Sequence, residues 1–160
     1  MNKPRILITN DDGIYSKGIY ALWQAMNELG HTFVVAPDNE QSAKSHSITI
    51  NKPLRVQEIE RENGFKGCAV SGTPADCAKI AIRSLMIDQP DILISGINQG
   101  ANLGTNLIYS GTVSAAAEGA MLGISSIAIS LASFKSDDYE TAKKVATNVV
   151  KHVMKNNLPR

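Results

Sequence analysis

The sequence predicts a doubly wound α/β fold, with helices covering both faces of a mostly parallel sheet in three α/β/α layers. Short apolar runs recur along the chain, and segments with helical apolar spacing lie between them. Polar, glycine-containing loops follow several of these runs. Continuous apolar runs are typical of strands buried on both faces. Their alternation with helices indicates parallel pairing through right-handed crossovers.

The elements follow one another as this fold requires. Strands are expected at 5–9, 32–36, one or two edge or hairpin pieces within 48–59, 68–70, 91–95 and 126–131. Helices are expected from Ile19 to Leu29 with Gly30 as the C-terminal cap, from the N-cap Thr73 to about Met86, from 110–112 onward, and over a final stripe of Ala142, Val145, Ala146, Val149 and Val153.

The length and net charge of the chain limit the kinds of function that are expected. The chain has 160 residues, 43% of them hydrophobic, so residues 1–160 are expected to form a single domain with a sizeable core. The formal charge of +1 gives no reason to expect a nucleic acid or a membrane surface as partner.

No apolar run approaches the span of a bilayer, and no signal-peptide core precedes the first strand, so a cytoplasmic location is expected. Cys68 and Cys77 lack Cys-x-x-Cys spacing and are expected to be buried free thiols.

The first strand leads directly into a cluster of polar residues. Asn10, Asp11 and Asp12 follow the apolar run without a spacer, and Gly13 permits a tight turn. The same residue types also favour an ordinary turn with no further role. In an open parallel sheet, however, ligands bind at the carboxyl ends of the strands, where this pair of carboxylates is expected.

Two later polar stretches end at the same expected edge of the sheet. Ser42 lies in the long loop 37–47, and Asn98 lies in the polar loop expected over 96–106. With Asp11 and Asp12 they supply two carboxylates, a hydroxyl and an amide oxygen. These are hard ligands that suit Mg²⁺ or Mn²⁺ and do not suit copper or structural zinc. We therefore expect one divalent cation per subunit, held by these four residues.

A further polar group is expected at the start of a helix. Ser110, Gly111 and Thr112 would present backbone amides and hydroxyls at a positive helix end, as phosphate groups require. Capping and close packing of the helix are the alternative explanation for these small residues. The Walker A pattern and the Gly-x-Gly-x-x-Gly fingerprint are both absent, so an NTPase or a Rossmann dehydrogenase is not expected.

Taken together, these segments resemble the SurE (survival protein E) family of nucleotidases, stationary-phase phosphatases of bacteria and archaea. The matching segments appear in family order over nearly the whole chain: Ile8–Gly13, Ala36–Asp38, Gln41–Ala43, His46–Thr49, Ser71–Cys77, Ser95–Asn98 and Ser110–Ser114. The resemblance implies metal-dependent hydrolysis of nucleoside 5′- and 3′-monophosphates, with cleavage of short polyphosphate as a further activity. It also implies a homo-dimer or homo-tetramer.

The resemblance implies that Asp11, Asp12, Ser42 and Asn98 are the metal ligands. From the residues themselves, Asp11 and Asp12 are expected to be the catalytic carboxylates. Asn98, Ser110, Gly111 and Thr112 are expected to bind the phosphate. The sequence leaves open whether Asp11 forms a covalent intermediate or water attacks directly. It offers no obvious general acid, because a lone loop histidine such as His46 is more often solvated.

Family members continue well past residue 160, with a further strand and a segment that exchanges between subunits. The chain is therefore expected to be short at its C-terminus. We expect it to fold around four parallel strands, to expose an unpaired edge, to associate, and to have weak or no activity. An inactive nucleotidase is thus one alternative. The other is a non-enzymatic receiver-like domain that accepts a phosphoryl group, although a receiver needs an aspartate after the third parallel strand, where this chain has Asn98.

Overall fold

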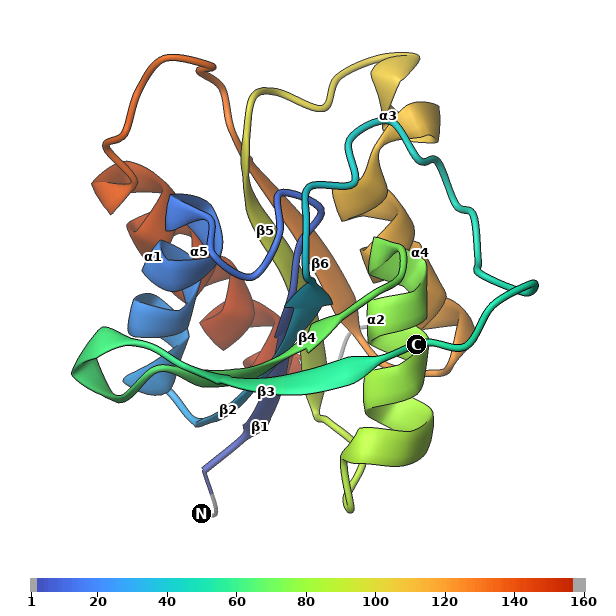
Figure 1. Ribbon diagram of the computed structural model, residues 1–160. Helices are drawn as coiled ribbons and strands as arrows, with labels where there is room; N and C mark the ends of the chain where they lie inside the picture. The colour runs from blue at the N-terminus through green and yellow to red at the C-terminus, as the bar shows by residue number, and fades with distance from the viewer. Residues whose placement is uncertain (1–2, 157–160) are drawn as a thin grey trace.

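The computed structural model describes residues 3–156 and has helices on both faces of a six-stranded sheet (Figure 1). The expected three-layer α/β/α fold is confirmed. The strands are β1 (Arg5–Thr9), β2 (His31–Pro37), β3 (Val56–Glu60), β4 (Lys66–Val70), β5 (Ile92–Gln99) and β6 (Ser126–Leu131). The helices are α1 (Lys17–Asn27), η1 (Glu62–Gly64), α2 (Pro74–Ile80), η2 (Ala81–Leu85), α3 (Asn106–Tyr109), α4 (Gly111–Met121) and α5 (Glu140–Asn156).

The strand order is β3-β4-β2-β1-β5-β6, which places β1 inside the sheet. The strands from β4 to β6 in this order pair in parallel, and β3 alone runs antiparallel, at the edge beside β4. The expectation of four parallel strands was wrong, because the short segment around Cys68 joins β2 in parallel register and makes a fifth. Within 48–59, only the last residues join the sheet, as part of the edge strand β3.

The continuous apolar run of β1 is explained by a core on each face of the sheet. Ile6 and Ile8 pack into one core with residues of α1 and α5, and Leu7 points to the other core, formed with α2 and α4. Since side chains alternate between the faces of a strand, every position must be apolar when both faces are covered. This arrangement fixes β1 rigidly and therefore fixes the polar residues that follow it.

One helix end agrees in part with the expectations, and one helix face differs. Helix α1 ends at the cap residue Glu28, and the N–H of Gly30 bonds to the carbonyl oxygen of Met26 in the last turn at 3.1 Å. Gly30 also serves packing, since a Cβ there would lie 2.2 Å from the carbonyl oxygen of Pro4. In α5 the buried residues are Ala142, Ala146, Val150 and Val153, whereas two valines of the expected stripe, at 145 and 149, are exposed. Both sets follow the helical repeat of 3.6 residues, so the buried face is rotated from the expected one toward Val150.

The second helix begins as expected and ends differently. Thr73 caps α2 through a capping box with Asp76, and Pro74 occupies the first helical position. Beyond Ile80 the helix widens into a π-type turn that ends at Leu85, one residue before the expected end. None of the helices within residues 3–156 is long and apolar enough to cross a membrane.

Strand β5 is longer than expected, and this decides where Asn98 lies. Gly96 was expected to begin a loop, but the strand continues to Gln99 across an irregularity in register between Ser95 and Asn98. Asn98 remains paired with Ser130 of β6. A glycine within a strand often marks such a bulge, since it permits the local bend without ending the pairing. Asn98 is therefore held by the sheet rather than by a loop.

Candidate active site

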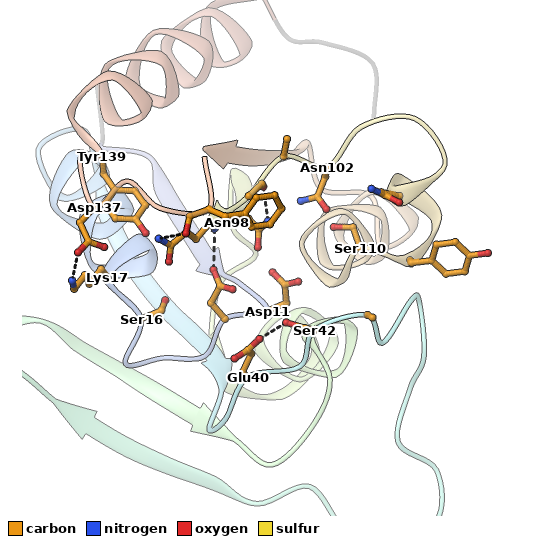
Figure 2. A pocket seen from close by; sticks show the side chains of 18 of the residues that line it. Asp11, Ser16, Lys17, Glu40, Ser42, Asn98, Asn102, Ser110, Asp137 and Tyr139 are labelled. Carbon is orange, nitrogen blue, oxygen red and sulfur yellow. Dashed lines mark hydrogen bonds and ion pairs between the residues drawn. The ribbon is translucent and has the colours of Figure 1, made fainter. Parts of the chain in front are cut away.

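A polar pocket of about 760 Å³ lies at the carboxyl end of the parallel strands. Figure 2 shows Asp11, Glu40, Ser42 and Asn98 around one space, although they come from separate segments of the chain. The pocket lining is Asp11, Asp12, Tyr15, Ser16, Lys17, Glu40, Ser42, Ala43, Asn98, Gln99, Gly100, Ala101, Asn102, Asn106, Tyr109, Ser110, Phe134, Asp137 and Tyr139. The expected grouping of the four candidate metal ligands at one edge is thus present.

Asp11 is the more deeply placed of the two carboxylates, with a relative exposure of 6%. Its Oδ1 accepts a 2.6 Å hydrogen bond from the hydroxyl of Thr112, at the start of α4. Gly111 packs so closely that an added Cβ would lie 2.7 Å from the Cβ of Asp11. Burial raises the pKa of Asp11, and the hydrogen bonds from Thr112 oppose that shift. The carboxylate is therefore held in one position by α4.

Asp12 lies beside it with a less buried carboxylate, and Oδ2 accepts from the backbone N–H of Gln99 at 3.3 Å. Burial, and next the charge of Asp11, raise the pKa of Asp12 to about 6. Glu40 adds further negative charge at both carboxylates. Between residues 3 and 156, neither aspartate forms a salt bridge, and the nearby Lys17 is paired with Asp137. The pocket therefore carries uncompensated negative charge, which a bound cation would neutralise.

The hydrogen bonds of Ser42 and Asn98 leave oxygen atoms suited to a cation. Ser42 donates its hydroxyl proton to Glu40, so its oxygen lone pairs can face a positive ion. The amide nitrogen of Asn98 donates to the carbonyl oxygen of Gly100 at 2.8 Å, which identifies the other end of the amide as the free Oδ1. In the part of the chain that the structure describes, no three His, Cys, Asp or Glu side chains gather as a metal cluster. Two carboxylates with a hydroxyl and an amide oxygen nevertheless fit a hard divalent cation.

The three candidate phosphate-binding residues at the start of α4 are placed differently from one another. Ser110 lines the pocket, and its hydroxyl accepts from the backbone N–H of Val113 at 3.2 Å, so it caps the helix. Gly111 and Thr112 are buried beside the pocket and do not line it. Ser110 therefore caps α4, as the alternative explanation predicted, and the hydroxyl of Thr112 donates a hydrogen bond to Asp11.

One supporting residue fixes the turn that follows β1. Asn10 is fully buried, and its amide nitrogen donates to the carbonyl oxygen of Gly13 at 2.9 Å and to the hydroxyl of Ser16 at 2.8 Å. It therefore fixes the turn that presents both aspartates to the pocket. Its turn-forming residue type was the available signal, since asparagine side chains often bond to nearby backbone groups.

The expectation that His46 is merely solvated is wrong. Its Nε2 lies 2.8 Å from Oε2 of Glu118, a carboxylate on α4 that is almost fully buried. Lys79 of α2 contacts the other oxygen of Glu118 at 3.0 Å. Burial alone would raise the pKa of Glu118, but the hydrogen bonds from His46 and Lys79 outweigh it and hold the pKa below its usual value. This cluster ties the loop that carries Ser42 to the helix that positions Asp11.

Comparisons with known proteins identify the family of this chain. A family described as "Survival protein SurE" matches residues 6–160. A protein named 5′-nucleotidase SurE from Chlorobium limicola is 48% identical over 159 residues, which are 99% of this chain and 62% of that protein. One of the same name from Syntrophobacter fumaroxidans is 50% identical over 155 residues, covering 97% of this chain and 62% of that protein.

A solved structure shows the same fold. The crystal structure of the SurE protein from Aquifex aeolicus superposes with a TM-score of 0.87 at 44% identity, covering 96% of this chain and 61% of the other. The chain thus spans about 60% of the length of the relatives that it matches. Both the sequence match and the fold cover the polar pocket and the strands that form it, and the chain belongs to the SurE family.

Proposed function

We propose that this chain carries the active site of a metal-dependent phosphomonoesterase that hydrolyses nucleoside 5′- and 3′-monophosphates, and short polyphosphate as a further substrate. The observation that carries the proposal is the pair of adjacent carboxylates, one buried and one partly buried, at the carboxyl edge of the sheet beside a polar helix start, with no basic partner among residues 3–156. The relatives' name, 5′-nucleotidase, supports the choice of substrate class. Since the chain spans only part of those proteins, their activity is a proposal for this one.

The proposed cation is Mg²⁺ or Mn²⁺, one per subunit, with Asp11, Asp12, Ser42 and Asn98 as ligands. When bound, such a cation would polarise the phosphate and lower the pKa of bound water. Asp11 and Asp12 are assigned to catalysis because they supply the negative charge of the pocket. Thr112 holds the Asp11 carboxylate in one position, which limits the reorganisation needed during the reaction.

The phosphate is proposed to bind between Asn98 and the start of α4. Ser110 lies at the pocket wall, and Gly111 and Thr112 follow it in the first turn of the helix, where the partial positive charge favours an anion. The Oδ1 of Asn98 is proposed to serve the cation, while its amide nitrogen donates to the carbonyl oxygen of Gly100. Whether Asp11 attacks phosphorus or water attacks directly stays an open part of the proposal.

The receiver alternative has no structural support. A receiver would need an acceptor aspartate after β5, and Asn98 and Gln99 end that strand instead. The family assignment points to hydrolysis as well. A homo-dimer or homo-tetramer and a cytoplasmic location, both expected from the sequence, remain proposals, and sedimentation of the purified chain tests the first.

The decisive assay is release of inorganic phosphate from 5′-AMP, 3′-AMP and tripolyphosphate, each with Mn²⁺, with Mg²⁺ and with a chelator. The proposal predicts release that needs a divalent cation and is lost in Asp11→Asn. Phosphate release that persists in excess chelator, or that is unchanged in Asp11→Asn, would rule out this assignment of the site.

A further inference from the structure

One pocket residue has chemistry that neither metal nor phosphate binding explains. Phe134, in the segment between β6 and α5, lines the pocket with a relative exposure of 77%. Two tyrosines, Tyr15 and Tyr109, also line it and are exposed, but their hydroxyls can bond to water. A phenylalanine has no polar group, so Phe134 offers an aromatic, apolar surface to a ligand of this polar pocket.

The ring of Phe134 rests on bare backbone. It lies against Gly100, where an added Cβ would come within 2.1 Å of the ring carbon Cε1. Gly100 has a φ of 114°, a conformation that disfavours any side chain there. The absence of a side chain at Gly100 therefore makes room for the ring, most of which stays exposed in the pocket.

The backbone around Phe134 is also fixed. The side-chain amide of Gln99 donates to the carbonyl oxygens of Phe134 and Ser136, each at 3.3 Å. The hydroxyl of Ser133 accepts from the backbone N–H of Ser136 at 3.1 Å. The backbone N–H of the same Gln99 bonds to Asp12, so one residue connects the aromatic ring with the catalytic carboxylates. Gln99 therefore positions the segment that carries Phe134 relative to the two carboxylates.

The spacing suits a nucleotide. Asn98, the proposed ligand of cation and phosphate, bonds through its amide nitrogen to the carbonyl oxygen of Gly100 at 2.8 Å, and Phe134 lies against Gly100. Only one ribose separates the phosphate of a nucleoside monophosphate from its base, so a base near Phe134 is compatible with a phosphate near Asn98. We propose that Phe134 is the stacking platform for the nucleobase, and that it gives the site its preference for nucleotides over other phosphate esters. This inference rests on the proposed nucleotidase function.

Steady-state kinetics with two substrates test the inference. AMP carries a base and ribose 5-phosphate does not, whereas both present the same phosphate ester. Phe134→Ala should raise KM for AMP by roughly 5- to 150-fold, the range expected for loss of one stacked base, and leave kcat nearly unchanged. For ribose 5-phosphate, kcat/KM should change less than twofold. Phe134→Trp should restore the KM for AMP, since stacking needs only an aromatic face.

A matched control separates stacking from general effects of removing an exposed apolar side chain. Met121 is 75% exposed and does not line the pocket, so Met121→Ala should leave both substrates unaffected. An equal loss for AMP and ribose 5-phosphate in Phe134→Ala would overturn the proposal. An unchanged KM for AMP in Phe134→Ala would also overturn the proposal. If the variant changed only sedimentation, Phe134 would be a subunit contact instead.

A binding experiment keeps this inference separate from the proposed function. If the parent chain releases no phosphate from either substrate, the function fails, and AMP binding measured by NMR still decides the subsite. Adenine stacked on the ring should shift the Phe134 ring protons upfield in the parent chain, and ribose 5-phosphate should not. Absence of that shift at saturating AMP would overturn the platform even if the chain proves to be an active phosphatase.

Discussion

The hydroxyl of Thr112 and the carboxylate of Asp11 are joined by a 2.6 Å hydrogen bond between two buried side chains that lie 101 residues apart in the chain. Thr112 was expected to bind the phosphate, whereas in this structure its hydroxyl supports the proposed metal ligand. Partners of this kind fix the orientation of a ligand and are often nearly as important as the ligand.

Replacing Thr112 with valine tests this relationship. Thr112→Val keeps the shape of the side chain but removes the hydroxyl that donates to Asp11. It should therefore lower the free energy of unfolding at neutral pH by about 1–3 kcal/mol. Mn²⁺ affinity should fall roughly 10- to 100-fold. Calorimetry measures both quantities, and Thr112→Ser, which keeps a hydroxyl, is the control. Unchanged metal affinity with slower turnover would instead identify Thr112 as a direct phosphate ligand.

Asp12 gives a prediction about the metal-free protein. Its pKa is raised to about 6, above the ordinary aspartate value of 3.8, so the charged form is disfavoured in the fold. Stability from this group is therefore present below the unfolded pKa and is lost as the pH rises through about 6. Asp12→Asn should raise the unfolding free energy at pH 8 by roughly 1–2 kcal/mol, after allowance for solvent screening, and change it little at pH 4.

The same Asp12→Asn variant should bind Mn²⁺ much more weakly, because it loses an ionised ligand. Thermal unfolding with and without Mn²⁺, at both pH values, measures the two effects together. If the variant were less stable than the parent chain at pH 8 without metal, burial and the charge of Asp11 would not be destabilising the ionised form of Asp12.

Glu118 should contribute stability of the opposite pH dependence. Its pKa is lowered, so its contribution is present above the unfolded pKa and is lost as the pH falls through the lower folded value. Glu118→Gln removes the charge that binds His46 and Lys79, and should cost about 1–3 kcal/mol at pH 7. Urea unfolding at pH 7 and pH 3 measures this cost, which should be smaller at pH 3.

A surface ion pair provides the comparison for Glu118. Glu140 pairs with Lys143 one turn away on α5 and is exposed, so Glu140→Gln should change stability by less than about 0.5 kcal/mol. If both glutamate variants lose the same small amount, the cluster of His46, Lys79 and Glu118 does not anchor the loop that carries Ser42.

Gly111 tests how closely α4 must approach Asp11. The Cβ of Gly111→Ala would lie 2.7 Å from the Cβ of Asp11 and 3.0 Å from its Oδ2. The variant should therefore displace the carboxylate and weaken Mn²⁺ binding. Gly64, in open space with a φ of 78°, offers a control, because asparagine tolerates that conformation. Gly64→Asn should bind Mn²⁺ as the parent chain does, and equal binding by Gly111→Ala would contradict the proposed geometry.

The fold could be predicted because its main signals are local. Apolar runs marked β1, β2 and β6, and the capping residues Thr73 and Pro74 marked the start of α2. The extent of β5 could not be predicted, since Gly96 resembles a loop residue until pairing with β6 is known. Likewise, the parallel pairing of β4 depends on a partner more than 30 residues earlier in the chain.

The candidate site could be predicted in part for the same reason. Asp11, Asp12, Ser42 and Asn98 end strands or follow them, and the topology alone brings them to one edge. The contacts of Thr112 with Asp11 and of His46 with Glu118 join segments far apart in the sequence, and no local pattern marks them. Phe134 was missed because a single aromatic residue in a polar segment has no periodicity to interpret.

The rate of phosphate release from AMP as a function of Mn²⁺ concentration tests the central claim most directly. The account predicts no release in chelator, saturation in parallel with the binding of one Mn²⁺ per chain, and loss of both in Asp12→Asn. Release that is independent of Mn²⁺ and Mg²⁺, or Mn²⁺ binding that Asp12→Asn leaves unchanged, would contradict it.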